Sequence, residues 1–289
     1  TDPSATDTHV IAWAVTRNAL PYASGSDATF SFTPDDQGQY IATLVITDSD
    51  GASDTKSITI TAINIAPSAM IILPPHLHEG GNTIQFTSLL DGPSDLAAGL
   101  LFSIDVGDDG SFELLDSANP DVNINLSNQG DYALRLRVKD KDGATRDYVR
   151  TISADNVPPN ATFALSTANA VTEGANGLSV QFTGASDPST SDTAAGFTYS
   201  YDLDGDGVFE IEKVALSSQL VSFPQEGERT IRGRIYDVDG GYSEYVLPIE
   251  VQNVAPTIVS FTGATVGDEG SSIAFSGSVT DPGADKLSA

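Results

Sequence analysis

Cysteine is absent from this chain of 289 residues, which has only one methionine and one tryptophan. Without cysteine there are no disulfides, no thiolate catalysis, no iron–sulfur clusters and no cysteine-ligated zinc. No apolar run approaches the roughly 20 residues needed to span a bilayer, so membrane insertion is not expected. Histidine is almost as scarce, with His9, His76 and His78 as the only three.

Basic residues are few, because 13 Lys and Arg stand against 40 Asp and Glu and give a net charge of −27. This charge repels phosphate backbones and anionic lipid head groups, which makes nucleic acid and acidic membrane surfaces poor partners. Cations are favoured partners for the same reason. Apolar residues still make up 39% of the chain. That share is enough to build cores, which argues against a disordered polyelectrolyte.

Catalytic motifs are missing as well. Three histidines leave few bases for a Ser-His-Asp site. None of the strings Gly-x-Ser-x-Gly, His-Glu-x-x-His and Gly-x-x-x-x-Gly-Lys occurs. Carboxylate pairs, which glycosidases use in a cleft, lie in turns here. Trp13 is expected in a core, since a sugar-binding face stacks several aromatic side chains. We predict that the chain is not an enzyme and has no catalytic residue.

The strongest signal is an internal repeat of about 93 residues. Two landmarks recur with the same steps of 92 and 97 residues. Asp-x-Asp-Gly occurs at Asp48–Gly51, Asp140–Gly143 and Asp237–Gly240. Asn-x-(Ala/Pro)-Pro occurs at Asn64–Pro67, Asn156–Pro159 and Asn253–Pro256. Two further strings, Glu-Gly and Thr-Asp-Pro, recur at Glu79–Gly80, Glu173–Gly174, Glu269–Gly270, Thr1–Pro3 and Thr280–Pro282.

Each repeat has the pattern of strands and turns. From Tyr132 to Val138, apolar side chains alternate with Arg135 and Arg137, which predicts a half-buried strand. This strand runs into Asp-x-Asp-Gly and a second Thr/Ser/Ile-rich strand, as in a hairpin. No window shows sustained helical periodicity. About seven short strands per repeat predict an all-β chain of tandem immunoglobulin-like sandwiches.

The sequence resembles polycystic-kidney-disease-type and cadherin-like Ig repeats of large bacterial surface proteins. The resemblance rests on the Asp-x-Asp-Gly hairpins, the Asn-x-Ala-Pro strings, and the stretch Phe197–Gly207, which reads Phe-Thr-Tyr-Ser-Tyr-Asp-Leu-Asp-Gly-Asp-Gly. It implies an extracellular, cell-surface stalk, spacer or adhesive module in an elongated array. On a common register we expect a partial domain lacking its first two strands at 1–66, full domains at 67–158 and 159–255, and two strands of a further domain at 256–289.

An acidic loop in the third repeat is a candidate calcium site. Oxygen ligands fall at positions 1, 3, 5 and 9 of a calcium loop, and Gly207 at position 6 permits its sharp turn. These ligands are Asp202, Asp204, Asp206 and Glu210. Lys213 takes the place of the usual Glu at position 12, so the loop is not an EF-hand. A solvated acidic turn is the alternative.

The second repeat keeps this pattern only in part. Positions 1, 5 and 9 are filled, but Gly107 replaces the acid at position 3. The remaining candidate ligands are Asp105, Asp109 and Glu113. The first repeat has no acids in this stretch, so no ion is expected there.

The linkers offer a second kind of calcium site. In an Ig-type sandwich the Asp-Pro and Asp-x-Asp-Gly turns face the preceding linker, whereas the Glu-Gly turn faces the next one. One junction is therefore expected to gather Glu79, Asn156, Asp187, Asp237 and Asp239, and the next Glu173, Asn253, Asp281 and Asp285. This resembles the calcium-rigidified junctions of cadherins. Alternatively, Asp-x-Asp-Gly is only what a tight hairpin turn requires.

With these acidic clusters, the resemblance implies a structural segment of an extracellular surface stalk or filament, rigidified by calcium (Ca²⁺). An adhesin or carbohydrate-binding tandem module of a secreted protein is the alternative. The expected partners are copies of the chain or neighbouring repeats, head to tail, and other surface proteins or glycans. Residues 256–289 are expected to supply the strands that 1–66 lacks, either between chains or along one longer polypeptide. Two frayed ends are the simpler alternative.

Overall fold

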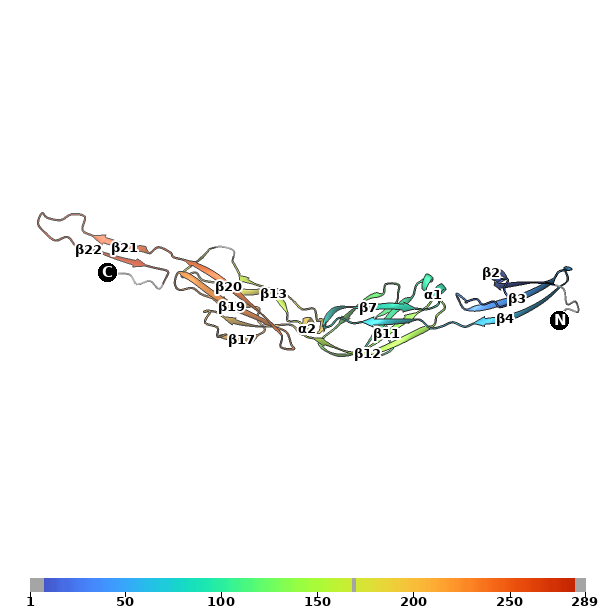
Figure 1. Cartoon of the computed structure of the whole chain (residues 1–289). Helices are drawn as coiled ribbons and strands as arrows, with labels where there is room; N and C mark the ends of the chain where they lie inside the picture. Colours follow the sequence, from blue (N-terminus) through green and yellow to red (C-terminus); the bar gives the residue numbers. More distant parts are fainter. Residues whose placement is uncertain (1–7, 168–169, 284–289) are drawn as a thin grey trace. The chain divides into compact units, whose positions relative to one another are not determined.

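The computed structural model describes residues 8–167 and 170–283 (Figure 1). Its regular elements are strands except for two helices of six residues each. The predicted class, all-β with tandem immunoglobulin-like sandwiches, is confirmed. Neither described helix has the length or the apolar character needed to cross a membrane.

The described residues fall into two compact units. One comprises residues 8–77, 82–124 and 131–153, and the other comprises 78–81, 125–130, 154–167 and 170–283. Three short segments of the second repeat, which contain Glu79, Ser127 and Asn156, are therefore part of the same compact unit as the third repeat.

The first repeat forms a single four-stranded sheet in the order β2-β1-β3-β4. Val15 and Tyr40 are buried on one face of this sheet, where Phe30 and Phe32 pack against them. Trp13 is half-buried, and its ring stacks on Phe30 with a centroid separation of 5.9 Å. The strands are β1 (His9–Arg17), β2 (Leu20–Gly25), β3 (Gly38–Asp48) and β4 (Ser53–Ala62).

The second repeat is a sandwich of two sheets, with strand orders β10-β7-β5 and β6-β12-β11-β8-β9. The predicted alternation is confirmed, since Leu134, Leu136 and Val138 are fully buried while Arg135 and Arg137 both reach Asp147. Its elements are β5 (Ser68–Ile72), β6 (Leu77–His78), β7 (Gly80–Leu90), α1 (Pro93–Ala98), β8 (Leu101–Val106), β9 (Leu114–Ser117), β10 (Asp121–Leu126), β11 (Gly130–Lys139) and β12 (Thr145–Asp155).

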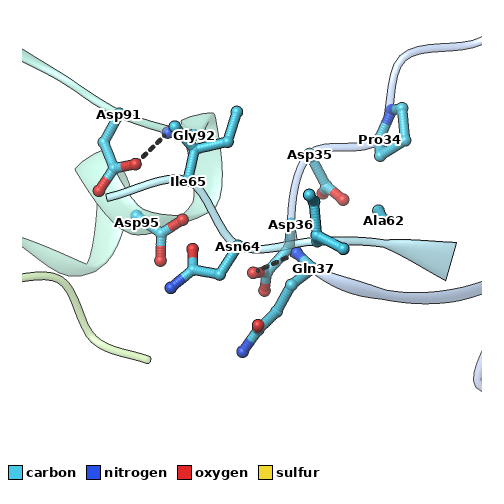
Figure 2. A pocket seen from close by; sticks show the side chains of 11 residues that line it. Pro34, Asp35, Asp36, Gln37, Ala62, Asn64, Ile65, Asp91, Gly92 and Asp95 are labelled. Atoms are coloured by element: carbon cyan, nitrogen blue, oxygen red, sulfur yellow. Dashed lines mark hydrogen bonds between the residues drawn. The ribbon is translucent and has the colours of Figure 1, made fainter. Parts of the chain in front are cut away.

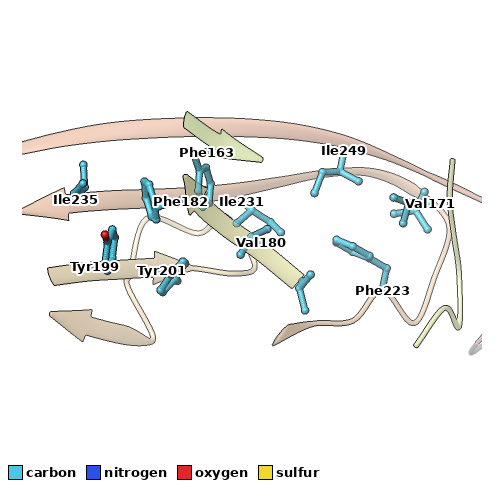
Figure 3. Packing of buried hydrophobic residues seen from close by; sticks show 12 residues of the cluster. Phe163, Val171, Val180, Phe182, Tyr199, Tyr201, Phe223, Ile231, Ile235 and Ile249 are labelled. Atoms are coloured by element: carbon cyan, nitrogen blue, oxygen red, sulfur yellow. The ribbon is translucent and has the colours of Figure 1, made fainter. Parts of the chain in front are cut away.

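The third repeat has the same plan, with sheets β13-β15-β18 and β14-β20-β19-β16-β17. Its core gathers Phe163, Phe182 and Tyr201 against Ile231 and Ile235 (Figure 3). Its elements are β13 (Asn160–Leu165), β14 (Val171–Thr172), β15 (Leu178–Ser186), α2 (Thr190–Ala195), β16 (Thr198–Asp202), β17 (Ile211–Val214), β18 (Ser218–Val221), β19 (Gly227–Tyr236) and β20 (Tyr242–Gln252).

Beyond the third repeat, β21 (Thr257–Gly263) and β22 (Phe275–Thr280) pair into a two-stranded sheet whose residues are all exposed. The strand motif Ile/Val-x-Phe recurs in three repeats with different burial. Phe86 and Phe182 are buried, whereas the corresponding Phe275 is 60% exposed. The hairpin therefore carries core-type side chains that no second sheet covers within the described residues.

Helical periodicity gave no sign of the two short helices α1 and α2. Six residues make fewer than two turns, so an amphipathic period cannot appear in the sequence. Local capping signals form them instead. Pro93 opens α1, and the Ser189 hydroxyl accepts a hydrogen bond from the Asp192 backbone N–H at the start of α2. Both helices bury the aspartate at their third position, Asp95 and Asp192.

Candidate metal centres

The first turn of each helix is hydrogen-bonded to a loop of the preceding repeat: α1 to the loop before β3, and α2 to the loop before β11. The Ser94 N–H donates to the Asp35 carbonyl at 3.1 Å, and the Ser191 N–H donates to the Ser127 carbonyl at 3.2 Å. These two equivalent attachments lie beside two clusters of acids. Each cluster, with the polar and basic side chains beside it, is called a junction. The first junction comprises residues of the first unit: Asp36, Asn64, Asp91, Asp95, Asp140, Lys141 and Asp142. The second junction comprises residues of the second unit: Glu79, Asn156, Asp187, Asp192 and Asp237.

The second junction brings three acids together. Carboxylate oxygens of Glu79, Asp187 and Asp192 all lie within 4.8 Å of one another. Glu79 is 2% exposed and Asp192 is completely buried. Glu79 Oε1 accepts a hydrogen bond from the Val157 N–H at 2.7 Å, and Asp187 Oδ1 accepts one from the Ser189 N–H at 2.8 Å.

The remaining oxygens of these three acids are unsatisfied. Glu79 Oε2, Asp187 Oδ2 and both carboxylate oxygens of Asp192 are buried without a hydrogen-bond partner among the described residues. Burying a charged oxygen without a partner costs free energy, and a nearby like charge adds to this cost. A bound cation would remove both penalties at once.

The electrostatics of the three acids agree with this geometry. Burial raises the pKa of Glu79, Asp187 and Asp192 above the ordinary carboxyl value. Negative neighbours add to the effect: Asp192 and Asp187 act on Glu79, and Asp237 and Asp239 act on Asp187. The pocket therefore favours a proton or a cation.

Asn156 and Asp237 lie together beside this group. Asn156 Nδ2 donates to Asp237 Oδ2 at 3.0 Å, and Asp237 Oδ1 accepts the Gly241 N–H at 2.8 Å. Asn156 Oδ1 is buried without a partner among the described residues. Asp239, predicted with them, is exposed and lies outside the three-acid group.

Sequence reasoning missed Asp192. An acid follows the Asp-Pro or Asp-Gly-Pro turn by four or five residues in two repeats, as Asp95 after Asp91 and Asp192 after Asp187. This internal recurrence was the available signal.

The first junction contains the corresponding acids. Oxygens of Asp91, Asp95 and Asp140 lie within 4.8 Å of one another. Asn64 Nδ2 donates to Asp140 Oδ2 at 2.9 Å, as Asn156 does to Asp237. Figure 2 shows Asn64 between the Asp35–Asp36 loop and the helix that carries Asp95.

The acidic loop of the third repeat also groups its four predicted ligands. Oxygens of Asp202, Asp204, Asp206 and Glu210 lie within 4.8 Å of one another. Asp202 is fully buried, but its oxygens already accept the Gly205 and Gly207 N–H groups, and Arg232 Nε lies 3.7 Å from Oδ2. The other three acids are exposed. The geometry accommodates an ion and equally suits a self-capped turn.

The corresponding acids of the second repeat are not grouped in the described structure. Asp105 accepts the Asp109 and Gly110 N–H groups, and Glu113 Oε2 accepts the Val106 N–H at 2.6 Å. Asp108 turns away to pair with Arg135 at 2.6 Å. With Gly107 at position 3, these carboxylates cap the backbone.

The last predicted junction is described only in part, because Asp285 lies outside the described residues. Glu173 is 1% exposed, and its Oε1 accepts the Val254 N–H at 2.8 Å. This repeats the contact of Glu79 with Val157. Asp281 Oδ1 accepts the Gly283 N–H at 3.1 Å.

No protein-family model matches the chain, and no curated protein is significantly similar to it. Among solved structures it is similar to the fibronectin(III)-like modules of Clostridium thermocellum CbhA, with 18% identity, a TM-score of 0.27, and coverage of 63% of this chain and 94% of that one. It is also similar to extracellular cadherin domains 3–6 of protocadherin gamma B2, with 14% identity, a TM-score of 0.29, and coverage of 87% and 68%. A third similar structure is Drosophila N-cadherin EC1–4, with 14% identity, a TM-score of 0.25, and coverage of 89% of this chain and 71% of that one. Similarities this low assign neither a family nor a function.

Proposed function

We propose that the chain is a structural segment of an extracellular stalk or filament whose second junction is ordered by calcium. One observation carries the proposal: carboxylate oxygens of Glu79, Asp187 and Asp192 lie within 4.8 Å of one another, and four oxygens of these acids are buried without a hydrogen-bond partner among the described residues. The sequence resemblance to surface repeats supports the extracellular location. A calcium site of this kind would suit such a location, since extracellular modules use sites of millimolar to submillimolar affinity.

The donor set selects the kind of cation. The grouped ligands are all carboxylate oxygens, with no sulfur or imidazole among them. Hard divalent cations prefer such oxygens, and calcium tolerates an irregular arrangement of them better than magnesium does. Calcium would be held by Glu79, Asp187 and Asp192. It would supply positive charge that orders the turn and the linker.

Removing one ligand is expected to weaken calcium binding at the second junction by at least about tenfold, because affinity follows the charge and number of ligands. The variants are Glu79→Gln and Asp192→Asn, measured by titration calorimetry and by the calcium-dependent rise in melting temperature. Asp204→Ala tests the separate loop of the third repeat, and Glu250→Gln, an exposed acid, is the matched control. Wild-type protein that takes up no calcium would contradict the proposal.

Calcium binding at the second junction is expected to strengthen as the pH rises. Three carboxyl pKa values are raised, so without an ion the folded junction favours protons, and stability is lost as the pH rises through these raised values. Calcium competes with those protons. The gap between melting temperatures in calcium and in chelator should therefore widen from about pH 4.5 to pH 7. A gap that stays constant with pH would be the opposite result.

The exposed hairpin supports head-to-tail assembly. Phe261 and Phe275 stack with a centroid separation of 5.8 Å on one face, while Ser260 and Ser278 pair on the other. In the third repeat, the equivalent pair β13 and β15 covers the core opposite β16 and β19. The first repeat has a single sheet among the described residues. The hairpin would supply the missing strands to the first repeat of another copy, or to the next repeat of a longer polypeptide.

The adhesin alternative has less support. An exposed aromatic platform would favour an adhesive or sugar-binding surface, but the exposed pair Phe261 and Phe275 lies on the hairpin assigned above to assembly. Trp13, the only tryptophan, is half-buried on Phe30, and its Nε1 donates to the Asp27 carbonyl at 3.0 Å. Other surface proteins or glycans as partners therefore rest on the resemblance alone.

A further inference from the structure

The two junctions share one framework. Asp95 and Asp192 occupy the third position of their helices. Asp140 and Asp237 open equivalent turns, and each accepts the backbone N–H four residues on, that of Ala144 or Gly241. The two linker asparagines donate to these turn aspartates in the same way. Differences between the junctions can therefore be assigned position by position.

The main difference is a basic side chain. Lys141 follows Asp140 in the first junction, and its Nζ lies 2.9 Å from Asp36 Oδ1 and 3.0 Å from Asp95 Oδ1. The contact with Asp95 is a charge contact without the direction of a good hydrogen bond. Lys141 also pairs with Asp142. The oxygens of Asp36, Asp95 and Asp142 lie within 4.8 Å of one another, so the ammonium sits at a point where carboxylates converge.

The second junction lacks this positive charge. Val238 stands in the position of Lys141, and Asn128 in that of Asp36. Val238 is 64% exposed. No Lys or Arg among the described residues forms an ion pair with Glu79, Asp187 or Asp192. The lysine and its aspartate partner are thus replaced together, and the buried acids are left without a counter-charge.

We infer that the Lys141 ammonium is a tethered cation that takes the place of a metal ion at the first junction, so that calcium controls the second junction and not the first. This inference rests on the proposed calcium site at the second junction. Asp95 belongs to both acid groups of the first junction, and an ammonium beside it lowers the attraction of both for a second cation.

The charge state of the acids agrees with the assignment. Lys141, followed by Arg17, holds the pKa of Asp36 well below its usual range, so this carboxylate is ionised and paired. At the second junction, by contrast, both carboxylate oxygens of Asp192 are buried without a hydrogen-bond partner among the described residues. Arg17 Nη2 lies 2.8 Å from Asp36 Oδ2 and adds a second positive group to the first junction.

The test of the first junction is Lys141→Met in the full chain. In chelator, the variant is expected to lose hydrogen-exchange protection at Asn64–Pro67 and α1. Added calcium should restore that protection, and the variant should bind one calcium ion more per chain than the wild type does. Lys139→Met is the matched control, because Lys139 Nζ pairs with Asp116 at 2.7 Å, away from the junction. It should add no ion.

The reciprocal change is Val238→Lys, which an exposed position tolerates. It is expected to remove one bound calcium ion, or to weaken that ion by at least about tenfold, and to protect the second linker in chelator. If both variants keep the wild-type number of ions and the wild-type protection, the inference is wrong.

Two failures can be told apart. Wild-type protein without bound calcium would overturn the proposed metal site. The loss of linker protection in Lys141→Met would still show that the first junction depends on its ammonium. Conversely, wild-type protein that binds calcium at the first junction with Lys141 in place would overturn this inference and leave the second site intact.

Discussion

Deleting residues 256–289 is expected to abolish end-to-end association of the chain while the second and third sandwiches stay folded. The deletion removes β21 and β22, whose apolar side chains include Phe261 and Phe275, exposed by 71% and 60%. Apolar strands that lack a partner sheet favour pairing with any complementary edge, and a head-to-tail contact that does not close on itself grows into a fibre. Sedimentation and electron microscopy measure the loss. Polymerisation of the truncated chain to the wild-type extent would refute strand complementation.

Point variants separate the apolar face from the hairpin as a whole. Phe275→Asp places a charge among the side chains expected to enter the partner's core, and should prevent association. Ser278→Asp is the matched control, because Ser278 faces the other side and pairs with Ser260. Equal loss with both variants would indicate that added charge alone disrupts the contact.

Tyr201→Ala is expected to unfold or severely destabilise the third sandwich. The Tyr201 side chain is fully buried, packs near Phe163 and Phe182, and donates its hydroxyl to the Leu216 carbonyl at 3.0 Å. Truncating a buried aromatic side chain leaves a cavity and costs about 3–5 kcal/mol. Chemical unfolding followed by hydrogen exchange on β16 and β19 measures this loss.

Two milder variants calibrate the effect at Tyr201. Tyr201→Phe removes only the hydroxyl and should cost about 1 kcal/mol. Tyr242→Ala truncates a tyrosine that is 48% exposed in the same sheet, and should have a much smaller effect than Tyr201→Ala. Equal losses for Tyr201→Ala and Tyr242→Ala would contradict the assignment of Tyr201 to the core.

The strands were predictable because alternation and turn residues are local signals. The stretch from Tyr132 to Val138 shows this, since a two-residue period reports directly which face is buried. Helix α2 was not predictable from periodicity, because six residues are too few to show one. Its first turn is instead attached through Ser191, whose backbone N–H donates to the carbonyl of Ser127, a residue 64 positions away.

The candidate sites also differ in how far they could be predicted, depending on whether their residues are close together in the sequence. The loop of Asp202 to Glu210 is local in sequence, and its four acids are close together in space as the spacing predicts. At the linkers, repeat logic placed Glu79 and Asp187 together but overlooked Asp192. It also could not reveal the role of Lys141, because a lysine in a turn is by itself an ordinary solvated residue. Only the distances to Asp36 and Asp95 distinguish it.

The paired replacement of Asp36 and Lys141 by Asn128 and Val238 makes the order of the repeats matter. Were the third repeat spliced directly after the first, Asp36 would meet Val238 and lose its ammonium, and the Glu79 carboxylate would be missing from the new boundary. The charged residues at each boundary therefore match only one order of the repeats, and they would be mismatched in a shuffled array. Recombination among such repeats would leave each repeat's own fold unchanged but would give boundaries whose charges no longer pair.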